Sequence, residues 1–120
     1  MKPEVLKQLG GISTATLTMQ LLKRGLRNCF IVGARPLNPS TCHFAAQAYT
    51  LRFIPMREDL SRVEVLGDPE YPPRKAVEDI PPGQAMVIDA RGETGAGVIG
   101  DILAARLQER GIAAIVSDGP

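Results

Sequence analysis

The last third of the chain, residues 84–120, contains a short apolar run, a glycine-rich turn, a helical pattern and a second apolar run in direct succession. The first run, residues 85–88, has the length and composition of a buried strand. Residues 101–110 repeat apolar side chains at helical spacing and end at a glycine, and residues 112–116 form the second apolar run. Strand, helix and strand in this order form a βαβ unit with parallel strands, which predicts an α/β fold.

A βαβ unit also indicates where a ligand binds. Ligands of such units lie beyond the carboxyl ends of the strands, against the N-terminus of the helix. We therefore expect the functional site around residues 89–103 and Asp118. Asp89 and Asp118 each follow a strand directly, although either carboxylate can equally cap a turn. Arg91 and Glu93, in the loop above the sheet, are weaker candidates of the same kind.

Length and charge restrict the class of protein. A chain of 120 residues supports one domain, and its 14 basic and 13 acidic residues leave no net field that would attract nucleic acid or a membrane surface. The N-terminus lacks a signal sequence and no apolar run has transmembrane length, which indicates a cytoplasmic protein. Cys29 and Cys42 have no metal-ligand spacing, so we expect free thiols.

The rest of the chain alternates between short elements and turns. The pattern predicts helices at residues 3–9, 13–24 and 74–79, strands at 29–32 and 44–54, and a long polar loop at 55–73. In the second strand, Tyr49, Leu51 and Phe53 share one face, while Thr50 and Arg52 share the other. A loop as long as 55–73, with a short helix or strand at 60–66, is typical of segments that are functional or contact a partner subunit.

The glycine-rich turn allows several interpretations. Gly95, Gly97 and Gly100 match the dinucleotide-binding pattern, and Asp118 stands where a ribose-binding acid would. However, the dinucleotide-binding pattern requires its first glycine at the end of the strand, and here residues 90–94 separate the strand from Gly95. The pyrophosphate of a dinucleotide would therefore have no binding position. A glycine loop with a purely structural role is the second interpretation.

A third interpretation keeps the helix N-terminus and changes the anion. The free N–H groups at residues 100–103 would form a socket for a carboxylate. Asp101 in the first turn is favoured by the helix dipole and could orient a metal-bound water, or could simply be a helix-start acid. His43 is the single histidine, and no nucleophile motif accompanies it.

Several motifs together resemble a known family. They are Val87-Ile-Asp-Ala-Arg-Gly, Gly100-Asp-Ile-Leu and Val116-Ser-Asp-Gly near the end of the chain, and Thr14-Ala-Thr-Leu, Gly33-Ala-Arg-Pro-Leu and Ala48-Tyr-Thr before them. This set resembles the RraA-like family. The family includes the regulator of ribonuclease activity A and the metal-dependent 4-hydroxy-4-methyl-2-oxoglutarate/4-carboxy-4-hydroxy-2-oxoadipate aldolases.

The resemblance implies a fold and a site. The fold would be a swivelling β/β/α three-layer sandwich, assembled as a homotrimer or hexamer with active sites between subunits. Gly100, Asp101, Ile102 and Leu103 would bind the carboxylate of a 2-oxo acid substrate through backbone amides, with Asp101 as the catalytic residue. The cofactor would be Mg²⁺ or Mn²⁺, held by the aspartate of an Arg-Asp pair that would lie beyond Pro120, so no metal ligand is expected within residues 1–120.

The resemblance also implies a function. We expect an aldolase that cleaves 4-hydroxy-2-oxo diacids to pyruvate, with oxaloacetate decarboxylation as a second activity. The alternative is a regulator that binds and inhibits an RNA-degrading endonuclease without chemistry. Because the Arg-Asp pair is absent and Pro120 follows the last strand closely, we expect a single domain truncated after the unit 84–120, without activity by itself.

Overall fold

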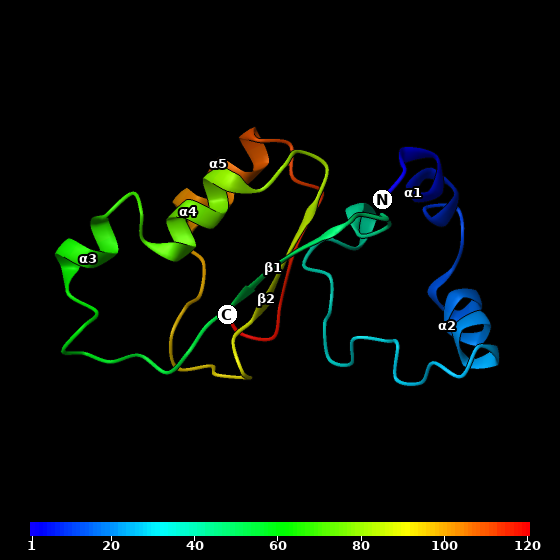
Figure 1. The fold of residues 1–120 in the computed structure, drawn as a ribbon, viewed down its shortest axis with the longest axis horizontal. Coiled ribbons are helices and arrows are strands. Elements are labelled where there is room, and N and C mark those ends of the chain that lie inside the picture. The colour runs from blue at the N-terminus through cyan, green and yellow to red at the C-terminus, as the bar shows by residue number, and fades with distance from the viewer. The chain divides into compact units, whose positions relative to one another are not determined.

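The computed structural model describes residues 1–120, which form two units, residues 1–47 and residues 48–120 (Figure 1). No helix in either unit is long and apolar enough to cross a membrane.

The second unit is a three-stranded parallel sheet with helices. Its elements are β1 (Ala48–Arg52), α3 (Val63–Gly67), α4 (Pro72–Asp79), β2 (Ala85–Asp89), α5 (Asp101–Glu109) and β3 (Ala114–Ser117). The strand order is β1-β2-β3, and both pairings are parallel. This confirms the predicted α/β class and the βαβ unit. The three-layer sandwich stays a prediction, because residues 48–120 contain one sheet.

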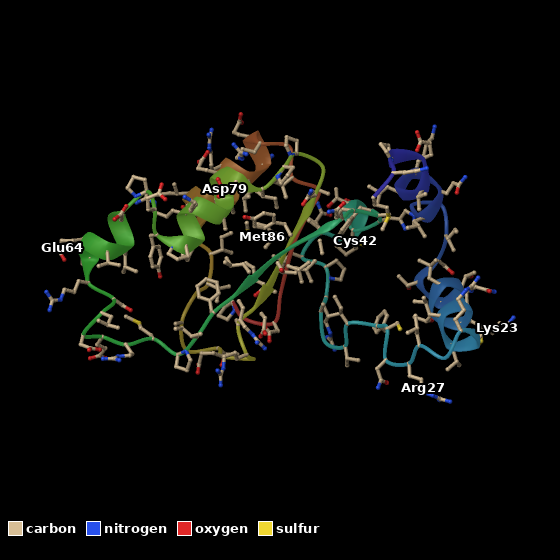
Figure 2. The ribbon with its side chains drawn as sticks, viewed as in Figure 1. Lys23, Arg27, Cys42, Glu64, Asp79 and Met86 are labelled. Carbon is tan, nitrogen blue, oxygen red and sulfur yellow. The ribbon has the colours of Figure 1, made fainter.

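The core lies between the sheet and one layer of helices. Helices α4 and α5 lie on the same side of the sheet (Figure 1). Side chains alternate along a strand, so Met86 and Ile88 point toward this layer, in register with Tyr49 and Leu51 of β1. The buried core comprises Ala76, Val77, Ile80, Met86, Ile88 and Leu107. Met86, labelled in Figure 2, is fully buried in its centre.

An ion-pair cluster joins the two helices at their surface. The two guanidinium nitrogens Nε and Nη2 of Arg106 each donate to Glu78 at 2.8 Å, and Arg110 lies 3.4 Å from the same carboxylate. The hydrogen bond from Arg106 lowers the pKa of Glu78. Both partners are half-exposed. The pair therefore sets the position of α5 against α4 more than it adds stability.

The first unit contains α1 (Pro3–Leu9), α2 (Thr14–Lys23) and a 3-10 turn, η1 (Pro39–Thr41). The Ser13 hydroxyl accepts from the Thr16 N–H at 3.2 Å and caps α2, and Gly25 with φ of 80° follows its last turn. His43 bonds through Nε2 to the Gly10 carbonyl. The predicted helices of this unit are confirmed, and no residue of 1–47 is buried.

Some predicted elements were wrong or too long. The expected strand at 29–32 is absent, because Asn28 and Gly33 at positive φ turn the chain on both sides of this exposed run. The strand expected at 44–54 is limited to the five residues that pair with β2. Both cysteines are free, as predicted, and both are exposed.

Leu107→Ala should destabilise the protein by about 2–5 kcal/mol, because Leu107 is 1% exposed and its truncation leaves a cavity against Met86. Ile102→Ala, on the same helix at 78% exposure, is the matched control and should change stability by about 0.5 kcal/mol or less. Urea unfolding followed by circular dichroism measures both. Equal losses would contradict the core described above.

Candidate functional site

The carboxyl ends of the three strands enclose an open groove. It has a volume of about 480 Å³ and is lined by Thr50, Leu51, Arg52, Val87, Ile88, Asp89 and Asp118. Thr50, Arg52, Val87 and Asp89 alternate with the core residues and so belong to the sheet face opposite α4 and α5. The groove lies at the edge of the sheet where ligands of parallel α/β units bind.

Arg52 and Asp89 form a charge pair at the ends of β1 and β2. Parallel pairing places the two residues opposite each other, and Arg52 Nε donates to Asp89 Oδ2 at 2.7 Å. The other carboxylate oxygen, Oδ1, accepts from the Arg91 N–H at 3.0 Å. These bonds, that from Arg52 foremost, lower the pKa of Asp89. The pair is solvent-exposed, so Arg52 can exchange Asp89 for an anionic ligand.

Asp118 holds the loop that follows β2. Its Oδ1 accepts from the N–H of Ala90 and its Oδ2 from the N–H of Gly92, at 2.8 Å. Residues 90–93 form a turn in which Arg91 and Gly92 both have positive φ. The Glu93 N–H donates to the Ala90 carbonyl oxygen at 3.1 Å and closes this turn. This is the geometry of a type I′ turn, which is strained at a non-glycine residue. Asp118 thus ties the exit of β3 to the exit of β2.

Backbone packing strengthens this connection. Val98 donates to the Pro120 carbonyl at 2.7 Å. A Cβ at Gly119 would lie 2.6 Å from Ala90 Cβ and 2.9 Å from the Glu93 carbonyl oxygen, so only glycine fits there. The glycine-rich loop is therefore anchored at Ala90, Gly92 and Val98 to the residues that follow β3.

The dinucleotide interpretation loses support from the loop itself. The Gly95 N–H donates to Glu93 Oε1 at 2.7 Å, which places a carboxylate on the first glycine of the pattern. A negative charge there would repel a pyrophosphate. Gly95, Gly97 and Gly100 are also absent from the residues at positive φ, so they do not make the tight turn that the pattern serves.

No side chain from outside α5 caps the N-terminus of this helix. Gly100 is the N-cap and has no side chain to offer, and Asp101 Oδ1 accepts only from its neighbour, the Ile102 N–H, at 2.9 Å. The N–H groups of Asp101 and Leu103 have no intrahelical acceptor in a helix that begins here. Asp101 has no ion-pair partner. Carboxylate binding at this helix end, expected from the sequence, stays a prediction.

The structure brings together part of the predicted site. Asp89 and Asp118 line one groove with Arg52, whereas Asp101 is not among the residues that line it. Arg52 and Thr50 were not predicted as site residues. The signal was their place on the polar face of the strand at 44–54, which becomes the groove face only when β1 pairs with β2 in parallel.

Residues 1–120 contain no group of three or more His, Cys, Asp or Glu side chains that could hold a metal ion. Asp89 and Asp118 already accept hydrogen bonds on both oxygens, and Asp101 on one. These residues therefore do not fit a divalent cation by themselves.

Comparisons with known proteins are consistent with the motifs. The RraA-like family, described as Aldolase/RraA, matches residues 14–120. Among solved structures, the chain is similar to RraAS2 of Streptomyces coelicolor, described as an unusual member of the RNase ES inhibitor RraA protein family. The identity is 30% and the TM-score 0.79, covering 98% of this chain and 55% of that one, so the chain spans about half the length of that protein. No curated protein matches.

Asp118→Ala should release the loop after β2, because the amides of Ala90 and Gly92 lose their acceptor. We expect hydrogen exchange at these two amides to become about tenfold faster or more. Asp68→Ala is the matched control, since it removes one carboxylate–amide bond, to Glu70, in a different loop. Unchanged exchange at Ala90 and Gly92 would show that Asp118 does not hold the loop.

Arg52→Gln should raise the pKa of Asp89 toward its ordinary value, because the guanidinium hydrogen bond is the largest cause of its lowering. The pair stabilises the fold at pH values above the ordinary carboxyl pKa of about 3.9, and this contribution disappears as the pH falls through the lowered pKa. NMR titration of the Asp89 carboxyl carbon measures the shift. Arg57→Gln, which breaks the pair with Asp59, should leave it unchanged.

Proposed function

Because the chain belongs to the RraA-like family, we propose that the complete protein is a divalent-metal-dependent lyase that cleaves 4-hydroxy-2-oxo diacids to pyruvate. The observation that carries this proposal is the uncapped N-terminus of α5, with Asp101 as its first residue. Oxaloacetate decarboxylation is a second reaction of the same kind. The substrate, the metal and the reaction remain proposals, since the chain spans about half of its structural relative.

The helix N-terminus would bind the substrate carboxylate. The backbone N–H groups from Gly100 to Leu103 point along the helix axis toward the start of α5, where the dipole favours an anion. Asp101 Oδ1 accepts a hydrogen bond from the Ile102 N–H, and an incoming substrate carboxylate would take the place of this oxygen. The exposed Ile102 side chain leaves this end open to solvent.

Asp101 would then handle a proton. Cleavage breaks the bond between C3 and C4. The 4-hydroxyl group loses its proton, so that C4 becomes the carbonyl carbon of the second product, and C3 takes up a proton to give pyruvate. Displaced from the Ile102 amide, the Asp101 carboxylate can orient a water that relays these protons. A divalent cation, when bound, supplies Lewis-acid stabilisation of negative charge on the 2-oxo acid. Its ligands would come from outside the groups that residues 1–120 bring together.

The assembly and location belong to the same proposal. We expect a homotrimer or hexamer that acts in the cytoplasm on a small 2-oxo acid, with Mg²⁺ or Mn²⁺ as cofactor. The active site would lie between subunits, the metal ligands would come from outside residues 1–120, and residues 1–120 alone should be inactive.

A regulatory role is the second candidate. Its support is the structural relative, which is described as a member of an RNase ES inhibitor family. In this role the chain would bind an RNA-degrading endonuclease and inhibit it without chemistry. The test is cleavage of a labelled RNA by such an endonuclease with increasing amounts of the protein. Inhibition with no pyruvate release would favour this function over the lyase.

In the complete protein, Asp101→Ala should lower pyruvate release about 10–100-fold while lowering Tm by only a few degrees, because an exposed helix-start acid contributes little to stability. Thermal unfolding and a coupled pyruvate assay with Mg²⁺ or Mn²⁺ are run on the same preparation. Asp79→Ala, at the exposed end of α4, is the control and should keep full activity. Normal turnover of Asp101→Ala, or equal turnover with excess chelator, would contradict the proposal.

A further inference from the structure

The residues that follow β3 contact the glycine-rich loop at both of its ends. Asp118 accepts hydrogen bonds from the N–H groups of Ala90 and Gly92, at the beginning of the loop. The Pro120 carbonyl accepts one from the Val98 N–H at 2.7 Å, shortly before the N-cap of α5. The exit of β3 therefore holds the loop where it leaves β2 and again where it enters α5.

Gly119 packs between these two contacts. A Cβ at this position would lie 2.6 Å from the Ala90 Cβ, 2.9 Å from the Glu93 carbonyl oxygen and 3.6 Å from Val98 Cγ1. These atoms belong to both ends of the loop. The loop thus closes around the Gly119 backbone, and a side chain there would displace the beginning of the loop.

The beginning of the loop is held in a strained conformation. Arg91 has a φ of 63°, in the left-handed region that is unfavourable for a residue other than glycine. Its N–H donates to Asp89 Oδ1, while the amides on either side of it donate to Asp118. Three successive amides therefore each bind a carboxylate oxygen. Without the Asp118 carboxylate, the turn loses two of these three hydrogen bonds and can relax from the strained conformation.

The end of the loop leads directly into α5. Val98 and Ile99 pack against the hydrophobic core of the second unit. The Ala104 N–H then donates to the Gly100 carbonyl at 2.9 Å, which is the first hydrogen bond within the helix. The free N–H groups of the first turn point along the helix axis, so their direction depends on where the loop ends.

We propose that Asp118 is a positioning residue for the start of α5 and hence for the carboxylate that binds there. Both of its oxygens are occupied by loop amides, so it acts through the loop and does not bind the ligand itself. The inference rests on the proposed function for the identity of the ligand, a 2-oxo acid. The coupling between Asp118 and the helix start rests on the contacts described above.

Steady-state kinetics separate positioning from stability. Helix-start amides bind the carboxylate in the ground state and in the transition state alike, so their displacement raises KM more than it lowers kcat. In the complete protein, Asp118→Ala should raise the KM for oxaloacetate about tenfold or more and change kcat by less than about threefold. Pyruvate release with Mg²⁺ measures both. A residue that only stabilises the fold would lower the apparent kcat through a smaller folded fraction and leave KM unchanged.

A conservative variant and a matched control accompany this measurement. The single carbonyl oxygen of Asp118→Asn can accept from only one of the two loop amides, so its KM should lie between those of the wild type and Asp118→Ala. Asp68→Ala removes a carboxylate–amide hydrogen bond to Glu70 in a different loop and should keep the wild-type KM.

Hydrogen exchange tests the coupling without metal or substrate. In the complete protein, Asp118→Ala should make exchange of the Ala104 amide about tenfold faster, because the first turn of α5 loses its support. The Ile112 amide donates to the Leu107 carbonyl at 3.1 Å, at the far end of α5, and should keep its rate. Equal acceleration at both amides would indicate a general loss of stability and would overturn the proposal.

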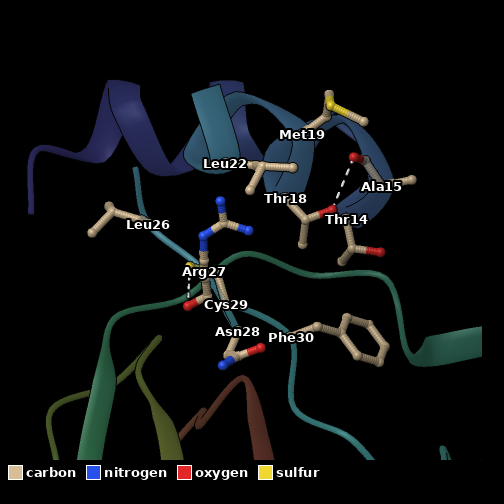
Figure 3. A pocket seen from close by; sticks show the side chains of 10 residues that line it. All are labelled: Thr14, Ala15, Thr18, Met19, Leu22, Leu26, Arg27, Asn28, Cys29 and Phe30. Atoms are coloured by element: carbon tan, nitrogen blue, oxygen red, sulfur yellow. Dashed lines mark hydrogen bonds between the residues drawn. The ribbon is translucent and has the colours of Figure 1, made fainter. Parts of the chain in front are cut away.

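The control for hydrogen exchange lies in the first unit. Thr18 lines an open groove of about 490 Å³ along α2, and its hydroxyl donates to the Ala15 carbonyl at 3.0 Å (Figure 3). Thr18→Ala also removes a side-chain hydrogen bond to the backbone, and it should leave exchange at Ala104 unchanged. Acceleration at Ala104 in this variant would mean that the effect is not specific to Asp118.

The two measurements fail separately. The proposal is wrong if Asp118→Ala leaves exchange at Ala104 unchanged, or if it lowers kcat at an unchanged KM. A wild type that releases no pyruvate would remove the proposed lyase and not the coupling, which exchange at Ala104 then supports or overturns by itself.

Discussion

The pairing of β2 with a parallel strand on each side determines where the candidate site residues lie. Because the carboxyl ends of parallel strands meet at one edge, Arg52, Asp89 and Asp118 come together although 37 and 29 residues separate them along the chain. The same pairing sends Met86 and Ile88 into the core under α4 and α5. One interaction therefore builds both the hydrophobic core and the polar groove, on opposite faces of a sheet.

The groove and the start of α5 offer different chemical groups to a ligand. The groove presents a paired arginine and carboxylates that are already hydrogen-bonded, and the helix start presents unpaired amides with Asp101. Asp118 connects the two, since it holds the beginning of the glycine-rich loop that leads to α5. A carboxylate ligand suits both regions, because one offers a guanidinium group and the other backbone N–H groups. A metal ion suits neither by itself, so the proposed lyase requires metal ligands from outside residues 1–120.

The small net charge of the whole chain conceals an unequal distribution of charge between its two units. The balance of 14 basic and 13 acidic residues leaves the chain as a whole with almost no net charge. Divided at residue 47, the same residues give a cationic unit without ion pairs and an anionic unit whose longest loop is acidic and apolar. The stretch 55–73, expected to be a long loop that is functional or contacts a partner, contains α3 and the start of α4, and its role stays a prediction.

The sequence by itself determined the local elements with strong signals: the capped helix that starts after Ser13, the short helix that ends at Asp79, and the βαβ unit with its parallel strands. Periodicity and capping act over a few residues, so one sequence is enough to recognise them. Only the tertiary structure decided that residues 29–32 form no strand, since a strand needs a neighbour. It also decided that Arg52 lines the groove, since its partner Asp89 comes from another strand. Both depend on contacts between distant residues, which hydrophobic periodicity along the chain does not encode.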